Sequence, residues 1–216
     1  MSFLSEAGEQ ALEAAVAEIE AVSSAEVVIA IRPRARYALT QHATVGLTAA
    51  IGMLAFTLYS PIEFAIWHIL VLPVLAGVLG ALLVEAWPAL YRFVAPPWLR
   101  QEHVREAAYA AFVERAVHAT RDRTGLLVYV ALRERMVELV GDVAVMGEVG
   151  IETLAAWAGA LEAELPRGAE AFATRLAAEL VPALARQLPR RHDDIDELAN
   201  AVQVLGAPPR HRKVVP

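Results

Sequence analysis

Two apolar runs lie back to back in the first half of this chain. Ala38 to Ile62 contains no Asp, Glu, Lys or Arg, Glu63 interrupts, and Phe64 to Val84 is again free of these residues. A helix needs about 20 apolar residues to cross roughly 30 Å of hydrocarbon, and each run meets that length. The link around Ser60 has room only for a turn. The sequence therefore predicts a two-helix transmembrane hairpin over 38–85.

The residues that flank the runs predict an orientation. The connecting turn has Glu63 and no basic residue, whereas arginines stand before the first run and after the second: Arg32, Arg34, Arg36, Arg92 and Arg100. Cytoplasmic loops carry the excess of positive charge, so we expect a multi-pass protein of the bacterial inner (plasma) membrane with both termini cytoplasmic. Segment 86–100 mixes aromatic residues with prolines and is expected to lie along the headgroups.

Composition excludes several classes of function. The chain has 216 residues, of which 57% are hydrophobic, and it has no cysteine. Disulfides, zinc–thiolate sites and cysteine nucleophiles are therefore excluded. The formal net charge is −6 and the basic residues are scattered, so nucleic acid is not an expected partner. Residues 207–216 form a basic segment that we expect to be a disordered tail.

The remaining sequence alternates between helical and strand patterns. Before the apolar runs, the patterns predict a helix over Ser5–Val22 and a buried strand over Glu26–Ile31. After the apolar runs, the patterns predict a helix over Gln101–Thr120, strands over Leu126–Ala131 and Met136–Val140, and a loop over Gly141–Gly150. Two helices, Ile151–Leu165 and Ala169–Leu188, and an edge strand, Ala201–Leu205, are expected to follow. This order predicts an α/β fold, a small mixed sheet covered by helices, assembled from 1–36 and 101–206 as one discontinuous domain.

Three segments, in this order, resemble the TPM domain family, which includes thylakoid-lumen photosystem II repair proteins and many bacterial membrane-linked proteins. They are LSEAGEQALEAAVAEIEAVSSAEVVIAI at the start, TGLLVYVALRERMVELVGD in the middle, and DDIDELANAVQVL after the two closing helices. The resemblance covers almost everything outside the predicted hairpin. It implies an α/β fold with a small mixed sheet. Members of this family include acid phosphatases, proteins that bind calcium or other divalent cations, and auxiliary or assembly factors of membrane complexes.

The chain departs from the family pattern in two places. The family often has Asp-Arg-Gly after its third strand, where this chain has Asp142, Val143 and Ala144. The change removes an arginine and a glycine that a phosphate-handling site would use. The apolar pair inserted after the first strand is the second departure, since many members carry a signal peptide and a separate span instead.

Hairpin geometry gives a candidate site that is independent of the resemblance. If Leu132 and Arg135 flank a two-residue turn, antiparallel pairing places Gly125 opposite Asp142. The loop that holds Asp122 then lies beside the loop that holds Asp142, which also contains Glu148. Three carboxylates at one end of the sheet predict a metal site for Ca²⁺ or Mg²⁺. The alternative is that Asp122 and Asp142 cap helices or pair with Arg121 and Arg123.

Three functions are compatible with this sequence. The preferred hypothesis is a membrane-anchored interaction or assembly module whose partners are the lipid bilayer and another membrane protein. The alternative is a divalent-metal-dependent phosphatase that uses Asp122, Asp142 and Glu148. A small channel or transporter subunit is the third, and the lack of charged residues within the apolar runs argues against it.

Overall fold

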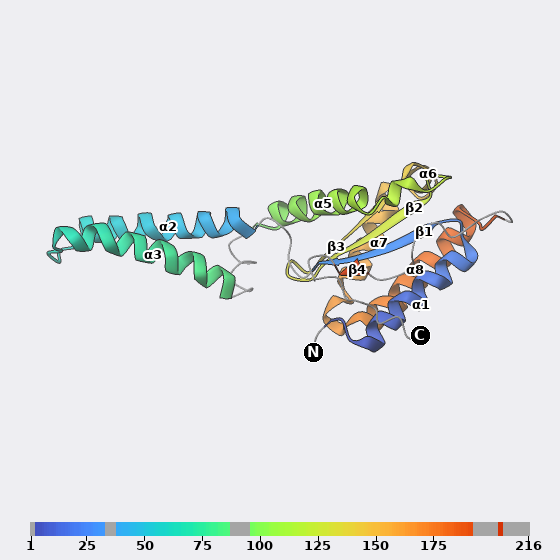
Figure 1. Ribbon diagram of the computed structural model, residues 1–216, viewed down its shortest axis with the longest axis horizontal. Helices are drawn as coiled ribbons and strands as arrows, with labels where there is room; N and C mark the ends of the chain where they lie inside the picture. Colours follow the sequence, from blue (N-terminus) through green and yellow to red (C-terminus); the bar gives the residue numbers. More distant parts are fainter. Residues whose placement is uncertain (1–2, 33–37, 87–95, 192–202, 205–216) are drawn as a thin grey trace, which may run out of the picture. The chain divides into compact units, whose positions relative to one another are not determined.

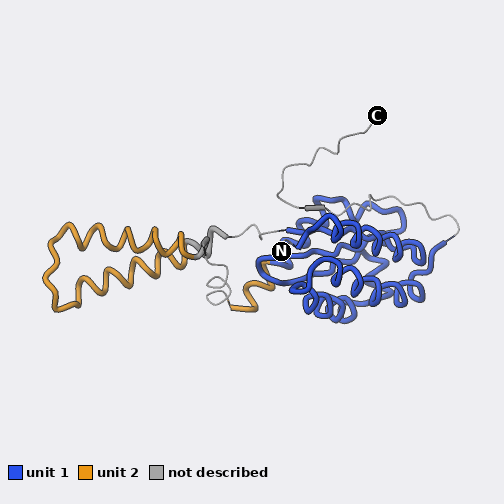
Figure 2. Tube along the Cα trace, turned by 90° about the horizontal axis from the view of Figure 1, so that it is seen from below, with its two compact units in different colours: residues 1–35, 104–216 blue, residues 36–103 orange. Residues whose placement is uncertain are grey.

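The structure is a computed structural model that describes residues 3–32, 38–86, 96–191 and 203–204. It divides into two compact units (Figure 2). The first comprises residues 1–35 and 104–216 and contains the sheet. The second comprises residues 36–103 and contains the two apolar helices. Each unit is described by itself below.

The first unit opens with the predicted helix and strand. Helix α1 spans Glu6–Val22 and strand β1 spans Glu26–Arg32. Ser5 caps the helix as expected, since its hydroxyl accepts a hydrogen bond of 3.0 Å from the Gly8 amide. Every third or fourth residue of α1 is apolar and buried, namely Leu12, Ala15, Val16 and Ile19. This stripe fixes the face that α1 turns toward the sheet.

The sheet has the strand order β3-β2-β1-β4. Strand β2, Gly125–Ala131, pairs parallel with β1 and antiparallel with β3, Met136–Gly141. The two-residue edge strand β4, Gln203–Val204, pairs parallel with β1. Leu126 lies opposite Gly141 and Ala131 lies opposite Met136, so the predicted hairpin register is confirmed. The small mixed α/β sheet covered by helices is confirmed as well.

Helices cover both faces of the sheet (Figure 1). Helices α1, α7 (Ile151–Glu162) and α8 (Ala169–Gln187) pack on the face that presents Val27, Ile29 and Ile31. The buried part of α5 (Pro97–Glu114) packs on the opposite face. Since all seven residues of β2 are buried, this strand lies between two apolar layers.

The structure differs from the predicted segments in several places. The helix expected over 101–120 begins earlier, at Pro97, and ends at Glu114, after which Val117–Ala119 form a short 3₁₀ helix, η1. Residues 97–100 of the expected interfacial segment therefore belong to α5. The loop expected over Gly141–Gly150 contains a short helix, α6 (Val143–Glu148). A second 3₁₀ helix, η2 (Leu165–Arg167), separates α7 from α8. Most of 86–100, and the tail at 207–216, lie outside the described residues.

Tyr129 is the largest of the fully buried side chains. It lies on the α5 side of β2, and within the described residues its hydroxyl makes no hydrogen bond of regular geometry, although the Arg32 guanidinium is close enough to interact with it. Burial raises the pKa of this phenol, and the nearby Arg32 guanidinium acts in the opposite direction. A buried polar group left unpaired costs about 1–3 kcal/mol of stability.

Removing the Tyr129 hydroxyl is therefore expected to stabilise the protein. We expect Tyr129→Phe to raise the free energy of unfolding by about 1 kcal/mol, because the ring is kept and the unpaired group is lost. Tyr129→Ala, which also removes the ring, should lower it by about 3–5 kcal/mol. Thermal unfolding of the two variants in detergent micelles measures both changes. A loss of stability in Tyr129→Phe would show that the hydroxyl is paired.

The second unit is an antiparallel pair of helices, α2 (Ala38–Tyr59) and α3 (Ile66–Ala86). Glycines bring the two backbones together. A Cβ atom at Gly46 would lie 2.8 Å from the Gly77 carbonyl oxygen, and one at Gly77 would lie 3.1 Å from the Gly46 oxygen. Gly80 makes the same kind of approach to Ala49. Small residues at such a contact are typical of helix pairs in membranes.

The large apolar side chains of this unit point away from the contact. Half or more of the side chain is exposed at many positions along both helices, including Leu47, Ile51, Phe56, Leu70, Val74, Val78, Leu79 and Leu82. Within the described residues, one helix segment, Ile66–Leu83, is long and apolar enough to cross a membrane, while Ala43–Tyr59 is a shorter apolar helix. Length and composition thus identify one span where the sequence predicts two. Helix α2 is the less apolar of the pair and contains Thr44, Thr48 and Thr57.

Candidate functional site

The candidate site lies where β2 begins and β3 ends. A tight turn leads into β2, in which the Arg123 amide donates to the Thr120 carbonyl over 3.2 Å and the Thr124 amide donates to the Thr120 hydroxyl over 3.1 Å. Arg123 adopts a left-handed conformation, with φ of 59°. The turn holds Asp122 and Arg123 beside the first residue of the strand.

Asp142 follows β3 directly and is almost completely buried. Its amide donates to the Gly125 carbonyl over 2.8 Å, so Gly125 and Asp142 lie opposite each other as the register predicts. Its Oδ1 accepts a hydrogen bond of 2.7 Å from the Val143 amide, and the residue is the N-cap of α6. Asp142 thus both continues the pairing of β3 with β2 and starts a helix.

The two loops meet through arginines. The Nε atom of Arg123 lies 3.0 Å from Oδ2 of Asp142, and the Ala144 amide donates to the Arg123 carbonyl. Asp122 forms a separate ion pair of 3.2 Å with Arg191, which follows α8. The predicted proximity of the two loops is therefore observed. Helix capping and arginine pairing, which the sequence left open as the alternative, are observed as well: Asp142 caps α6 and pairs with Arg123, and Asp122 pairs with Arg191.

Glu148 does not join these groups. It is exposed and is the last residue of α6, whereas Asp142 caps the first turn. Six residues of helix place the two backbones about 9 Å apart along the axis of α6. Within the described ranges, no group of three or more His, Cys, Asp or Glu side chains is placed to hold a metal ion. Binding of Ca²⁺ or Mg²⁺, and phosphatase chemistry at this edge, stay predictions.

Replacing Asp142 tests the structural role that these contacts give it. Asp142→Ala removes the cap and leaves Arg123 without this carboxylate, so we expect the free energy of unfolding to fall by about 2 kcal/mol. Asp142→Asn keeps an oxygen that can cap α6 and should lose about half as much. Thermal unfolding measures both losses. Equal losses in the two variants would mean that the charge, and not the cap, carries the effect.

Two carboxylates that the sequence patterns did not single out, Glu20 and Glu162, have structural roles. Glu20 is buried, and its Oε1 accepts a hydrogen bond of 3.0 Å from the amide of Val27. Glu162 of α7 accepts one of 3.0 Å from the amide of Val137 at the edge of the sheet. Leu12, Val16 and Glu20 recur every four residues, and this spacing alone places Glu20 on the buried stripe. No comparable pattern marks Glu162.

Glu138 makes the folded state sensitive to pH. It lies opposite Tyr129 in β3, and burial raises the pKa of its carboxyl, partly offset by the Arg105 guanidinium. The folded state then binds this proton more tightly than the unfolded chain, so the contribution of Glu138 to stability falls as pH rises through its raised pKa. We expect Glu138→Gln to melt higher than the parent at about pH 8, and the gain to shrink as pH falls toward the ordinary value of 4.5. Melting both proteins between about pH 4 and 8 measures this, and a pH-independent difference would contradict it.

Comparison with known proteins supports the fold alone. No protein-family model matches this sequence, and no curated protein matches it. A solved structure of similar fold is that of the BA42 protein from the psychrophilic bacterium Bizionia argentinensis, determined by NMR. The similarity has a TM-score of 0.56 at 17% sequence identity, and it covers 94% of this chain and 96% of that one. At this identity, the shared property is the α/β architecture.

Proposed function

We propose that the chain is a membrane-anchored α/β domain that acts as an interaction or assembly module for another membrane protein. The α2–α3 pair is the anchor, and the sheet unit is the part that contacts the partner. The observation that carries the proposal is the arrangement of α2 and α3, whose glycines face each other while leucine, isoleucine, valine and phenylalanine face outward. In water this arrangement would leave a large apolar surface exposed.

The polar groups of the pair also suit a lipid environment. The Thr48 hydroxyl donates to the Thr44 carbonyl over 2.8 Å, and the Thr57 hydroxyl donates to the Leu54 carbonyl over 2.9 Å. Hydroxyls bonded back to their own helix need no water. At the end of the pair, the exposed Tyr59 and Trp67 supply aromatic rings of the type that lie at a membrane interface.

The attachment of the sheet unit supports the proposed role. The apolar pair leaves the unit after β1 and returns to it through α5, so the chain enters and leaves the anchor within one domain. Two connections hold a domain closer to the bilayer than a single linker of the same length does. The resemblance to TPM domains, some of which are auxiliary factors of membrane complexes, agrees with this role and is part of the proposal.

Membrane association and orientation can be tested on the full chain. We expect the protein to stay with the membrane after carbonate washing and to float with lipid in a density gradient. Because the chain has no cysteine, Ser2→Cys and Ser60→Cys each create a single labelling site. In intact spheroplasts an impermeant maleimide should label only Ser60→Cys, and permeabilisation should expose Ser2→Cys. Release by carbonate, or labelling of Ser2→Cys in intact cells, would contradict the proposal.

The role as an interaction module needs a separate measurement. Cross-linking of the full chain in native membranes, followed by purification, should recover a discrete membrane protein. Removing α2 and α3 should abolish that product, because the partner lies in the same bilayer. Recovery of the same product from a chain without the apolar pair would show that the anchor is not needed for recognition.

A further inference from the structure

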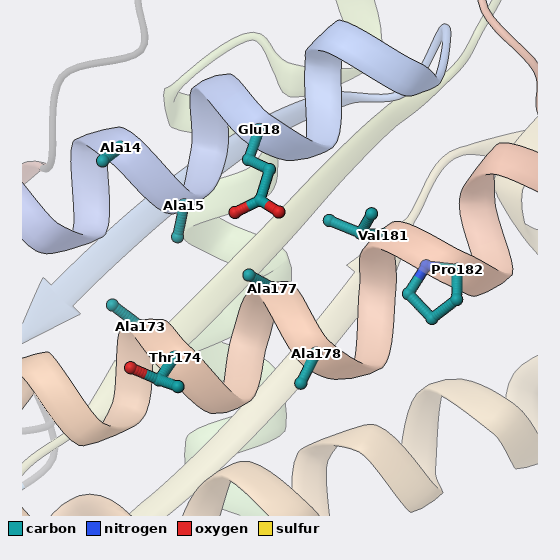
Figure 3. Close-up of a pocket in the computed structure, with 9 residues that line it drawn as sticks. All are labelled: Ala14, Ala15, Glu18, Ala173, Thr174, Ala177, Ala178, Val181 and Pro182. Atoms are coloured by element: carbon teal, nitrogen blue, oxygen red, sulfur yellow. The ribbon is translucent and has the colours of Figure 1, made fainter.

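Two surface features of the sheet unit lie outside the candidate site. The first is a groove of about 450 Å³ between α1 and α8 (Figure 3). Alanines from both helices form most of its lining, and Glu18 is its single charged lining residue. Small side chains let the two helices approach closely and leave this hollow beside their contact. The groove is therefore a consequence of helix packing, and its lining does not indicate a ligand.

The second feature is the turn between β2 and β3, Leu132–Arg135, which presents arginines at one end of the sheet. Arg135 is exposed and Arg133 is partly exposed. Glu134, which stands between them in the chain, is only 3% exposed. The turn therefore directs positive charge outward and keeps its carboxylate below the surface.

Arg32 adds a third arginine to this end of the sheet. It is the last residue of β1 and pairs with Ala131, the last residue of β2, and its carbonyl accepts a hydrogen bond of 3.1 Å from the Leu132 amide. Burial raises the pKa of the Tyr129 hydroxyl, Arg32 lowers it and Glu134 raises it, so both charged side chains lie close to that hydroxyl. Glu134 and Arg32 therefore share the inner side of this end.

The carboxylates that follow the turn have partners of their own. Glu162 accepts a hydrogen bond of 3.0 Å from the Val137 amide. Glu138 lies within electrostatic reach of the Arg105 guanidinium on α5. Arg135, by contrast, forms no ion pair within the ranges that the structure describes. Its positive charge is therefore available to an anion outside the chain.

The backbone of Arg135 is strained. Its φ of 55° lies in the left-handed region, which costs free energy for an L-residue and is adopted freely by glycine. Strained residues that a fold retains are concentrated at ligand contacts and other functional positions. The arginine at this position of the turn therefore indicates a role for its side chain that glycine would not fill.

We propose that Arg32 and the turn Leu132–Arg135 bind the phosphodiester headgroup of an anionic phospholipid. Guanidinium groups bind phosphate oxygens through paired N–H donors. In open α/β sheets, ligands bind outside the carboxyl ends of the strands, and β1 and β2 end side by side here. The inference rests on the proposed function, because a headgroup is within reach only if α2 and α3 lie in a bilayer.

Chain connectivity keeps these arginines near the headgroups of such a bilayer. Ala38, the first residue of α2, follows Arg32 by six residues, which extend to about 20 Å at most. The end of a spanning helix lies at the membrane interface. Cytoplasmic arginines at such a distance are attracted by the negative surface charge of the inner leaflet.

Lipid retention by the full chain tests this site. The protein is held in dodecyl maltoside micelles that contain increasing mole fractions of dioleoyl-phosphatidylglycerol or dioleoyl-phosphatidylcholine. Native mass spectrometry then measures the fraction of chains that retain a lipid. We expect tighter retention of phosphatidylglycerol, because its headgroup carries a net negative charge and the choline headgroup carries none. Equal retention of the two lipids would overturn the proposal.

Arginine substitutions assign the retention to the turn. Arg133→Gln with Arg135→Gln should weaken the retention of phosphatidylglycerol roughly twentyfold, because each cation near an anionic surface contributes a factor of about five. Arg115→Gln with Arg186→Gln is the matched control, which removes the same charge from two exposed arginines near the starts of β2 and β1. This control should retain the lipid as the parent does. An equal loss in the two double variants would overturn the proposal.

Arg135→Gly separates binding of the lipid from stability of the fold. Glycine adopts the left-handed conformation without strain, so this variant should melt about 2 °C higher than the parent while it retains phosphatidylglycerol about fivefold more weakly. Unchanged retention would overturn the proposal. Micelles require no crossing of a bilayer, so a chain that carbonate releases from membranes can still show this selectivity, and a chain that stays in membranes can lack it.

Discussion

We expect the double substitution Val74→Arg with Val78→Arg, in the middle of α3, to prevent the α2–α3 pair from inserting into a membrane. Both side chains are exposed, at 62% and 53%, and lie one turn apart near the centre of the helix. An arginine at the centre of a spanning helix costs about 2.5–3.5 kcal/mol on insertion scales, so the pair costs about 5–7 kcal/mol. We expect most of the double variant to be released by carbonate and to fail to float with lipid.

A matched variant separates insertion from a general effect of added charge. Val113→Arg with Val143→Arg also replaces two exposed valines, at 64% and 67% exposure, in the sheet unit. This variant should fractionate with the membrane as the parent does. If the α3 variant also remains in the membrane fraction, α3 does not cross the hydrocarbon core and the anchor has to be sought elsewhere.

Gly125→Ala is expected to be the most damaging single substitution in the sheet unit. A Cβ atom at Gly125 would overlap the carbonyl oxygen of Val117 and press on its side chain. This oxygen belongs to the backbone of η1, which is held by the hydrogen bond from Ala119 to Ala116 and by the turn at Thr120. Relieving this overlap requires the backbone to move, so we expect the free energy of unfolding to fall by about 3 kcal/mol or more. That loss would lower the melting temperature by roughly 10 °C.

Gly159→Ala is the control for this prediction. Gly159 lies on α7 with nothing within 4 Å of an added Cβ atom. Alanine favours a helix over glycine by about 0.8–1.0 kcal/mol, so this variant should be slightly more stable than the parent. Thermal melts of the two variants in the same detergent give opposite signs. A Gly125→Ala protein that melts within about 2 °C of the parent would mean that η1 can move away from β2.

The features that could be predicted are those encoded by local pattern. The cap at Ser5 and the buried stripe of α1 follow from residue type and helical spacing. The pairing of β2 with β3 follows from the short turn between them, since one turn length sets the register of the whole hairpin. The same register placed Asp142 beside Gly125 and brought the loop of Asp122 near it.

The features that could not be predicted depend on contacts between distant segments. The sequence left open whether Asp142 joins a metal site, caps a helix or pairs with a neighbouring arginine such as Arg123. It gave no sign that Arg191 pairs with Asp122, because 69 residues separate the two in the chain. Nor does it show that α6 forms, since six residues make fewer than two helical turns and are too few for an apolar period to be recognised. The metal hypothesis used only the proximity of the two loops, and this proximity does not determine which side chains pair with one another.

By itself the sequence determined the α/β class, the interruption of the domain by an apolar pair, and one strand register, because these follow from hydrophobic period and chain connectivity. Only the tertiary structure decided that glycines turn α2 and α3 toward each other, that the buried Tyr129 hydroxyl makes no regular hydrogen bond among the described residues, and that alanines leave a groove between α1 and α8. The physical reason is that close packing and unpaired polar atoms are properties of surfaces that meet in space, and the residues forming each surface are far apart in the chain.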